Sequence, residues 1–355
     1  MPPLDTNPCA ADDAADMRKY VESRPEATVY HLPQWRTIFR DGLGYRSFNL
    51  ESKESAGAMN GCLTLYLVRG LFSRRLVAVP FRDRGGPLWN SPAALDELLT
   101  GALAVARQEG ARVVSLKTVP AFDDDVAAAQ GFLRHDHWIR SVVELNKLDG
   151  DGYIRAIGPK TRNMIRQSER AGLTLEIPEA PLEKLAEWHA LHLATQQELG
   201  VPPFPRRFFA AMFRELAPAG NLRLFLVRRE EKILAASVVF RHGDTAIYGY
   251  SASAPDGRQH RPNDFMLFNI ITWARQQGLR FFDMGSDSPS QESLLFFKKK
   301  WLAEQQPIPT YVHGAGPTAL NDSSDSKYAS ARNVVRRLPR PMYGALGRLV
   351  TPYFG

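Results

Sequence analysis

The feature that most constrains this chain is a run of three short apolar segments that begins at Leu222. Leu222–Arg228, Ile233–Phe240 and Thr245–Ser251 are rich in aliphatic and aromatic residues, and charged residues or glycine separate them. Short apolar runs punctuated in this way are typical of antiparallel strands joined as a meander. The stretch therefore predicts a sheet onto which the following segments must pack.

A helix, a strand and a second helix are predicted after this meander. Asn263 is a good N-cap, Asp264–Gln277 carries apolar residues at helical spacing, and Gly278 is typical of a helix end. Arg280–Met284 predicts a strand and Gly285–Trp301 a lysine-rich closing helix. The mixture of strands and helices predicts an α/β (α+β) domain.

The first half of the chain has the same order of elements. Leu63–Arg69 and Leu76–Phe81 predict a hairpin, and Pro92–Gln108 predicts a helix with proline in its first turn. Strands are expected at Val113–Val119 and Trp138–Leu145. This order favours an internal duplication, with two mixed, mostly antiparallel sheets flanked by helices.

The length of the chain suits two domains better than one. At 355 residues it exceeds what a single hydrophobic core commonly needs. The polar run Asn146–Gly152 is the best internal boundary. We expect a mobile leader at residues 1–19, an N-terminal domain at 20–148, a C-terminal domain at 149–312, and a linker with a basic tail at 313–355.

The charge distribution limits the function classes. The formal net charge is +7, but residues 313–355 contain six basic and two acidic residues, so the tail holds more than half of the excess. The globular part therefore does not demand nucleic acid as a partner. No apolar run approaches the length of a membrane span, and the first residues lack the apolar core of a secretory signal. We expect a cytoplasmic protein, with the inner face of the membrane as the alternative location.

The cysteine and histidine patterns favour no metal. With two cysteines the chain has too few for a thiolate site or a disulfide framework, and Cys62 is interpreted as a buried structural residue. His135 and His137 lie two apart, and His189 and His192 lie three apart on a predicted helix. No nearby carboxylate completes a zinc-type ligand set, so no metal site is expected.

Several segments resemble known acyltransferases. The meander, loop, helix and strand resemble the acyl-CoA-binding half of a GNAT N-acyltransferase. The ending is similar to the FemAB-like branch, in which a D-x-G strand end precedes F-K-x-x-W/F; the matching residues are Asp283-Met284-Gly285, Phe296-Phe297-Lys298 and Trp301. Lys160–Gly172 and Gly200–Phe209 are also similar to that branch, and Leu71–Leu88 resembles FemAB-like proteins found with exopolysaccharide and PEP-CTERM sorting systems.

The resemblance implies a fold and an activity. It covers residues 20–312 and implies two tandem GNAT-like domains with a cleft between them. The expected reaction moves an acyl group from acyl-CoA to an amine of a cell-envelope or exopolysaccharide precursor. Aminoacyl-tRNA is the alternative donor, as in FemAB-like builders of peptidoglycan bridges. A noncatalytic accessory protein of polysaccharide biosynthesis and a membrane-surface scaffold are the competing interpretations, and the oligomeric state is left open.

Five residues are candidates for the transfer chemistry, which needs orientation, a proton acceptor and an oxyanion stabiliser. In the resembling F-K motif the two residues line the transfer site, which maps onto Phe297 and Lys298; a solvated charged face is the alternative. Asp283 would accept the proton of the amine or cap the following turn. Tyr248 and Tyr250, two apart on one strand, are expected to share a face, as a hydroxyl donor and a substrate contact, with core packing as the alternative.

The loop before the predicted helix is the expected donor site, because backbone N–H groups and the helix dipole favour a pyrophosphate there. The glycine motif Q/R-x-x-G-x-G/A of GNAT enzymes is missing, and Asp264 adds a negative charge. A solvated basic turn is the alternative. The candidate residues for donor binding are Gly257, Arg258, His260, Arg261 and Asn263.

Two further basic segments are candidates for binding. If the resemblance holds, Lys160, Arg162 and Arg166 would face the domain interface and bind a nucleotide-sugar phosphate or a carboxylate; an exposed basic helix is the alternative. Ala329–Gly355 alternates apolar residues with arginine. It predicts an interfacial segment that contacts a membrane, with a tail that packs on the domain or stays mobile as the alternatives.

Overall fold

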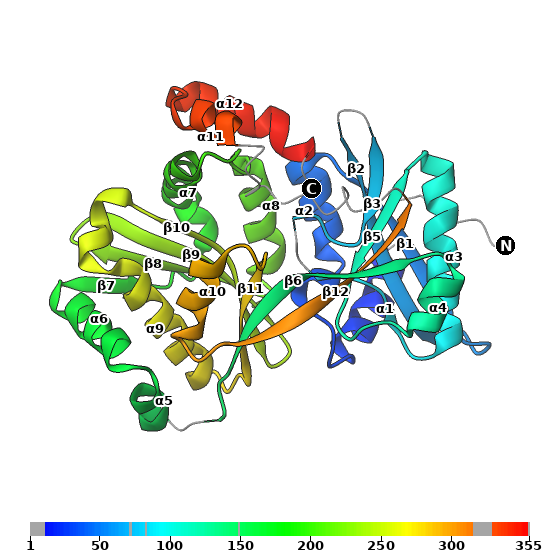
Figure 1. Cartoon of the computed structure of the whole chain (residues 1–355), viewed down its shortest axis with the longest axis horizontal. Helices are drawn as coiled ribbons and strands as arrows, with labels where there is room; N and C mark the ends of the chain where they lie inside the picture. Colours follow the sequence, from blue (N-terminus) through cyan, green and yellow to red (C-terminus); the bar gives the residue numbers. More distant parts are fainter. Residues whose placement is uncertain (1–10, 71–72, 82–83, 148–149, 315–328, 354–355) are drawn as a thin grey trace. The chain divides into compact units, whose positions relative to one another are not determined.

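The computed structural model describes residues 11–70, 73–81, 84–147, 150–314 and 329–353 (Figure 1). The chain folds into two compact units. The first unit is Met1–Trp138 with Pro307–Asp322 and Val350–Gly355, and the second is Ile139–Gln306 with Ser323–Leu349.

The first unit is a sheet with the strand order β1-β2-β3-β5-β12, to which β4 adds on β2. β3 and β5 are parallel, whereas the other pairs are antiparallel. The strands are β1 (Arg46–Lys53), β2 (Met59–Arg69), β3 (Arg74–Val77), β4 (Leu88–Trp89), β5 (Val113–Lys117) and β12 (Glu304–Gly314). The helices are α1 (Ala11–Glu22), a 3₁₀ turn at Val29–His31, α2 (Gln34–Leu43), α3 (Pro92–Glu109), α4 (Asp124–Ala129) and a 3₁₀ turn at Thr351–Tyr353.

The core of the first unit forms where α3 packs against β1, β2 and β5. Ser91 begins this helix, because its side chain accepts a hydrogen bond from the N–H of Ala94, and Gly110 ends it in the left-handed conformation. The predicted helix and hairpin are confirmed. β1 and β12 were not predicted from the sequence.

The second unit is a sheet with the order β6-β11-β10-β9-β8-β7, in which only the β10–β11 pair is parallel among the pairs described. The strands are β6 (Leu133–Glu144), β7 (Leu173–Glu176), β8 (Leu222–Arg229), β9 (Lys232–His242), β10 (Thr245–Ser253) and β11 (Phe281–Asp287). The helices are α5 (Gly150–Ala156), α6 (Pro159–Arg170), α7 (Leu185–Leu199), α8 (Arg206–Leu216), α9 (Pro262–Gln276), α10 (Glu292–Lys299), α11 (Ala329–Arg336) and α12 (Arg340–Val350), with 3₁₀ turns at Pro181–Lys184 and Pro255–His260.

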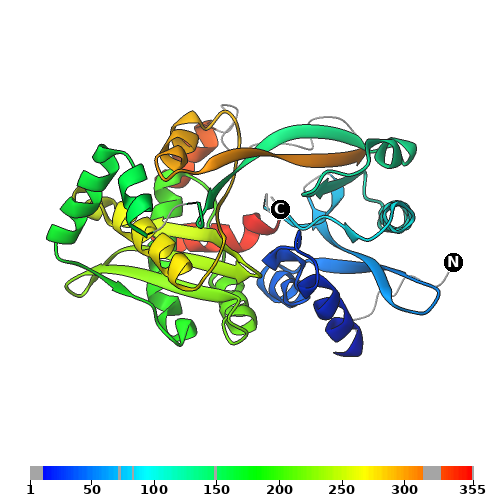
Figure 2. The same ribbon diagram turned by 90° about the horizontal axis from the view of Figure 1, so that it is seen from below.

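Helices cover both faces of the second sheet (Figure 2). α9 packs on β8, β9 and β10, with α6 against it, and their apolar side chains form one core. α7 packs on β9 and β10 together with α8, where phenylalanine and histidine rings meet. The predicted α/β (α+β) class, with mixed, mostly antiparallel sheets flanked by helices, is confirmed.

The two units have the same order of elements along the chain, but the last strand of each repeat pairs with a strand of the other repeat. In each, antiparallel strands lead through a helix (α3 or α9) to a parallel strand (β5 or β11). β6 follows the first parallel strand in sequence, yet its residues Ile139–Glu144 pair with β11. β12, from the end of the second repeat, pairs with β5. The domain limits expected at residues 148 and 312 differ from the observed division because each of these strands passes from one unit into the other.

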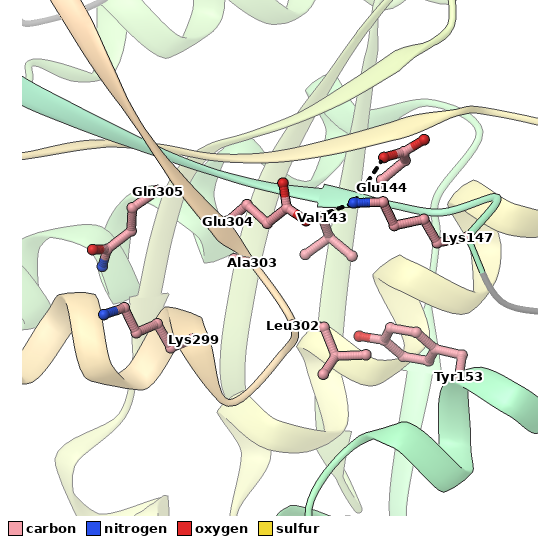
Figure 3. Close-up of a pocket in the computed structure, with 9 residues that line it drawn as sticks. All are labelled: Val143, Glu144, Lys147, Tyr153, Lys299, Leu302, Ala303, Glu304 and Gln305. Atoms are coloured by element: carbon pink, nitrogen blue, oxygen red, sulfur yellow. Dashed lines mark hydrogen bonds and ion pairs between the residues drawn. The ribbon is translucent and has the colours of Figure 1, made fainter.

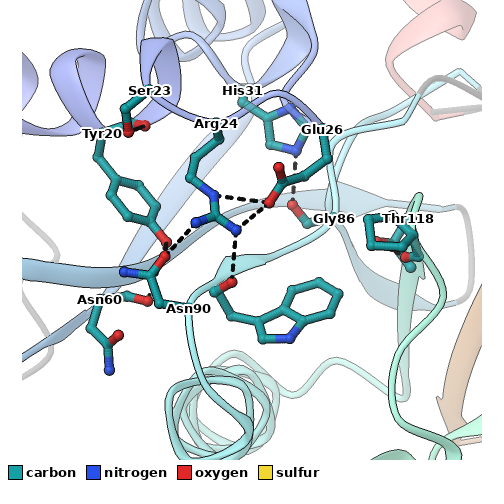
Figure 4. Close-up of polar contacts among 11 residues, drawn as sticks. Tyr20, Ser23, Arg24, Glu26, His31, Asn60, Gly86, Asn90 and Thr118 are labelled. Carbon is teal, nitrogen blue, oxygen red and sulfur yellow. Dashed lines mark hydrogen bonds and ion pairs between the residues drawn. The ribbon is translucent and has the colours of Figure 1, made fainter.

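The predicted mobile leader is wrong for residues 11–19, which lie in α1, while residues 1–10 lie outside the described part. Met17, Tyr20 and Val21 are buried. The Tyr20 hydroxyl donates to the backbone oxygen of Asn60 and to Oδ1 of Asn90, both at 3.1 Å. The guanidinium of Arg24 also reaches Asn90, at 2.6 Å (Figure 4). α1 is therefore part of the core of the first unit.

Two other boundaries, the end of β11 and the start of α10, differ from the predictions. The basic segment with Lys160, Arg162 and Arg166 is α6, which Pro159 begins after Gly158, so α5 before it is a separate helix. β11 continues to Asp287, so the closing helix begins at Glu292 and not near Gly285. No described helix is long and apolar enough to cross a membrane.

Residues 329–349 of the C-terminal tail pack on the second unit. α11 lies against α7, and the Gln197 side chain donates to the backbone oxygen of Leu338 at 2.6 Å. The hydroxyl of the buried Tyr343 donates to the backbone oxygen of Val201 at 2.7 Å. This part of the tail is therefore packed on the domain.

Candidate functional site

The site begins where β10 and β11 separate. The two strands pair in parallel only from Thr245–Phe281 to Ile247–Asp283. Beyond that point β10 continues along β9, whereas β11 pairs with β6. Both strands carry an irregularity there, between Tyr248 and Tyr250 and between Asp283 and Ser286. Diverging strand edges leave backbone groups available for a bound molecule, and bulges commonly redirect them.

Lys298 lies beside this divergence. It is on α10, which packs against β11, and it is only 6% exposed. Its Nζ donates to Oδ2 of Asp287 at 2.5 Å and to the backbone oxygen of Gly285 at 3.3 Å. Lys298 therefore points inward, and its charge is paired within the protein. Of the neighbouring lysines, Lys299 is exposed and Lys300 is half-buried.

Asp283 lies in the arrangement expected for a turn cap. It is buried, and its Oδ1 accepts a hydrogen bond from the N–H of Gly285 at 2.8 Å. Its Oδ2 lies 3.9 Å from the guanidinium of Arg140 on β6. Gly285 has a φ of +80°, which glycine adopts without strain. The carboxylate therefore stabilises the bulge in β11; its role as a proton acceptor stays a prediction.

Tyr248 and Tyr250 do not share a face, so that expectation is wrong. Tyr248 pairs with Val239 and Tyr250 with Val238, because the bulge inserts Gly249 between them. The Tyr248 ring contacts Phe282 on the α9 side, at a centroid distance of 6.2 Å.

The two tyrosines consequently have different surroundings. Tyr250 packs against the rings of Phe204, Phe208 and Phe209 on the α8 side, which matches the alternative of core packing. Burial raises the pKa of Tyr248 to about 12, so its hydroxyl stays protonated near neutral pH.

The loop before α9 does not gather its basic side chains. Arg258 forms an ion pair with Glu198 of α7 at 2.5 Å, and His260 lies 2.9 Å from the guanidinium of Arg229 on β8. Gly257 is buried against Leu234, where a Cβ would approach Cδ2 to 2.9 Å.

The start of α9 differs from the prediction. Arg261, with a φ of +57°, is the N-cap and Pro262 the first helical residue, so the expectation that Asn263 caps this helix is wrong. The side chain of Arg261 forms no capping hydrogen bond with the first turn of the helix.

A carboxylate lies in the first turn of α9. Asp264 is 6% exposed, and its Oδ1 accepts from Nζ of Lys300 at 2.6 Å. The same ammonium lies 4.4 Å from the ring centroid of Phe297. The positive end of α9 is thus already supplied with an anion from the chain itself, and Phe297 contacts Lys300.

The basic residues of α6 have different environments. Lys160 and Arg166 are exposed. Arg162 donates to the backbone oxygens of Arg155, at 2.8 Å, and of Ile157. It therefore caps the end of α5, and a purely substrate-binding role for it does not fit this geometry.

A separate cavity of about 590 Å³ lies in the second unit on the Lys299 side of α10 (Figure 3). Lys147 bridges Glu144 at 3.2 Å and Glu304 at 2.6 Å across it. None of the predicted site residues lines this cavity. Its lining consists of Val143, Glu144, Lys147, Tyr153, Lys299, Leu302, Ala303, Glu304 and Gln305.

Metal-type ligands do not gather in the described residues, where no group of three or more His, Cys, Asp or Glu could hold an ion. His192 is buried, and its Nε2 accepts from the N–H of Phe204 at 3.1 Å. Nε2 of His189 forms a hydrogen bond with the backbone oxygen of Phe204. Cys62 is buried, and burial raises the pKa of its thiol to about 12, so it is not a nucleophile near neutral pH.

Three residues of the site were not predicted. Asp287 pairs with Lys298, Arg140 faces Asp283, and Gly249 forms the bulge in β10. No spacing rule connects these positions to their partners. The one local signal is Gly249 itself, because a glycine inside a strand often marks a bulge.

Comparison with known proteins finds similarity to acyltransferases in part of the chain. The model of the acetyltransferase (GNAT) domain matches residues 159–291. The UDP-N-acetylmuramoylpentapeptide-lysine N(6)-alanyltransferase of Weissella viridescens is 23% identical over 169 residues, which are 47% of this chain and 49% of that protein. The match thus spans about half the length of this curated relative.

Solved structures share the fold. The crystal structure of FemX has a TM-score of 0.69 at 16% identity, and the similarity covers 86% of this chain and 97% of that one. The C-terminal domain of a putative lysylphosphatidylglycerol synthetase from Agrobacterium fabrum has a TM-score of 0.60 at 15% identity, covering 88% and 95%. Residues 159–291 thus match a GNAT domain, and the chain has the fold of these structures. The similarity to the alanyltransferase and to the fold of FemX agrees with the FemAB-like resemblance of the motifs.

Proposed function

We propose that the chain transfers an aminoacyl group from aminoacyl-tRNA to an amine of a cell-envelope precursor, with Lys298 at the reacting carbonyl. The supporting observation is the buried Lys298–Asp287 pair where β10 and β11 separate. Burying an ion pair is costly unless its geometry and hydrogen bonds are good. A buried ammonium beside open strand edges is consistent with selection for chemistry.

The chemistry needs little from the protein. The acceptor amine attacks the ester carbonyl of the donor, a C–N bond forms, and the ester C–O bond breaks. The proton lost by the amine ends on the leaving ribose oxygen or in solvent. In between, negative charge develops on the carbonyl oxygen, and a fixed ammonium stabilises it. Asp287 and the oxygen of Gly285 hold the Lys298 side chain in its orientation.

The donor assignment rests on the start of α9. A CoA pyrophosphate would need that positive helix end, where the buried carboxylate of Asp264 already lies. Arg258 and His260 have other partners, and the glycine motif is missing. The names of the alanyltransferase and the lysylphosphatidylglycerol synthetase both specify aminoacyl products. The exposed Lys160 and Arg166 are available to RNA phosphates.

Acyl-CoA is the second candidate donor. The matching domain model describes acetyltransferases, and the exposed Arg261 lies at the start of α9. The acceptor that we propose is the side-chain amine of a peptide in an envelope precursor, because the alanyltransferase acts on the lysine of UDP-N-acetylmuramoylpentapeptide. An exopolysaccharide amine is the alternative acceptor.

A transfer assay tests the proposal. The full chain is incubated with UDP-N-acetylmuramoylpentapeptide and either tRNA charged with labelled alanine or labelled acetyl-CoA, and label in the product is measured. We expect transfer from the tRNA. Because a lost oxyanion donor costs about 100-fold or more in kcat, Lys298→Met should lose at least that, whereas Lys299→Met, its exposed neighbour, should retain activity.

Two controls separate the possible failures. Thermal melting of Lys298→Met and of Lys298→Met with Asp287→Asn shows whether inactivity reflects unfolding. A thermal shift with CoA tests the other donor, since a ligand at 100 times its Kd stabilises a protein by about 2.7 kcal/mol. Transfer from acetyl-CoA alone would refute the tRNA assignment, and equal losses in the two lysine variants would refute the role of Lys298.

A further inference from the structure

We propose that α11 and α12 form a surface that docks the protein on an anionic lipid bilayer. The exposed apolar side chains of this surface are Val334, Met342 and Leu349, which are 63%, 59% and 69% exposed. The exposed cations beside them include Arg337 and Arg348. We call these five residues the tail surface. Its role is independent of the transfer reaction.

The inner side of the two helices is fixed to the second unit (Figure 1). Tyr343 is buried and bonded to Val201, and Arg336 donates to the backbone oxygen of Glu198 at 2.9 Å. Gly347 approaches Pro203 so closely that a Cβ there would lie 2.7 Å from the proline Cγ. Because one side of the helices is held in this way, the tail surface is the side that stays exposed.

The charge of the tail segment favours a partner with a negatively charged surface. Between residues 329 and 353 the chain has five arginines and neither aspartate nor glutamate. Such a segment attracts a surface of negative charge. Anionic headgroups and the phosphates of RNA both meet that condition, so charge alone does not choose between them.

The exposed apolar side chains decide in favour of lipid. Met342 and Leu349 are seven residues apart on α12 and therefore share a face. At a bilayer they would enter the boundary between headgroups and acyl chains, while the long arginine side chains reach the phosphates. RNA phosphates offer no such apolar contact. A helix that is basic and apolar on its exposed side is the type that lies in a membrane interface.

Vesicle sedimentation with the full chain tests the proposal. We expect binding to phosphatidylcholine vesicles that contain phosphatidylglycerol and little binding to pure phosphatidylcholine. Each arginine removed should lower the partition coefficient about fivefold at low salt, so Arg337→Gln with Arg348→Gln should lower it by both factors. Met342→Ser with Leu349→Ser should also release the protein. Leu133→Ser, which changes a residue 66% exposed in the first unit, is the matched control.

Two outcomes would overturn the inference. The first is vesicle binding that is unchanged in both double variants, which would locate the lipid contact elsewhere. The second is retention of the wild type by tRNA, lost in Arg337→Gln with Arg348→Gln, without any binding to anionic vesicles. All substituted side chains are exposed, so a thermal melt should show that the variants fold; the aminoacyl-transfer assay with a water-soluble acceptor should be unaffected.

Discussion

At the scale of single residues, the second unit contains two ion pairs whose lysines lie at the C-terminal end of α10. Lys298 pairs with Asp287, and Lys300 pairs with Asp264. Lys298 is much less exposed than Lys300, with side-chain exposures of 7% and 21%. Removal of one partner from such a pair leaves a desolvated charge, and that penalty exceeds the strength of the pair itself.

The first prediction concerns the Lys298–Asp287 pair. Asp287→Ala should lower the free energy of unfolding by about 3–5 kcal/mol, because the ammonium is left buried without its carboxylate. The double variant Lys298→Met with Asp287→Leu should lose clearly less. Urea unfolding at neutral pH measures both. If the double variant is as unstable as the single one, the pair is not the source of the penalty.

The second prediction concerns His192. Burial lowers its pKa to about 3, from the usual value near 6.5. Below pH 6.5 the unfolded chain therefore binds a proton that the folded chain does not. Stability contributed by the neutral ring is complete above pH 6.5 and is lost as the pH falls towards 3, by up to about 1.4 kcal/mol for each pH unit.

His192→Gln keeps an acceptor for the N–H of Phe204 but cannot titrate. The free energy of unfolding, measured in urea between pH 6.5 and 5, should fall less steeply in this variant than in the wild type. Parallel slopes for the wild type and His192→Gln would contradict the prediction.

At the scale of elements, close backbone approach decides how the tail helices are held. Gly347 lies against Pro203 in the connection between α7 and α8, whereas a Cβ at Gly344 on the same helix would meet nothing within 4 Å. Substitutions at the two glycines therefore distinguish the effect of helix propensity from the effect of packing. An alanine at either position gains about 1 kcal/mol of helix propensity. Only the alanine at position 347 would clash, because its Cβ would meet Pro203.

The third prediction follows from this difference. Gly347→Ala should loosen α12, and Gly344→Ala should leave it in place or stabilise it. Limited trypsin digestion measures the effect, because the bonds after Arg336 and Arg337 become more accessible when the helices detach. Equal digestion of the two variants would show that the approach to Pro203 does not hold the tail.

At the scale of the whole molecule, the chain completes each sheet with a strand from the other repeat. β12 pairs with β5, although Lys117 and Thr310 are 193 residues apart in sequence. The first unit therefore depends on the end of the second repeat. Pairings of such sequence separation carry a large loop-closure cost and form slowly.

The fourth prediction tests this dependence. A chain that ends at residue 306 lacks most of β12 and should lose hydrogen-exchange protection in β5, Val113–Lys117. A chain that ends at residue 322 keeps β12 but lacks α11 and α12, and should retain that protection. Loss of protection in both truncations would assign the effect to the tail helices.

The sequence alone determined the elements whose signals are local. The meander β8–β10 and the helix α3 with its Ser91 cap follow from apolar periodicity and from residues within one turn. The resemblance to the F-K motif indicated that Lys298 lines the site, and its side chain is buried, although its catalytic role is still a prediction.

Only the tertiary structure decided which elements meet. The partner of Lys298, the exchange of β6 and β12, and the opposite faces of Tyr248 and Tyr250 depend on pairings between distant segments. One inserted residue, Gly249, reverses the face of everything after it, because strand side chains alternate with period two. Strand propensity predicts that a strand forms, but its register is set by the partner strand, and the partner is supplied by the fold.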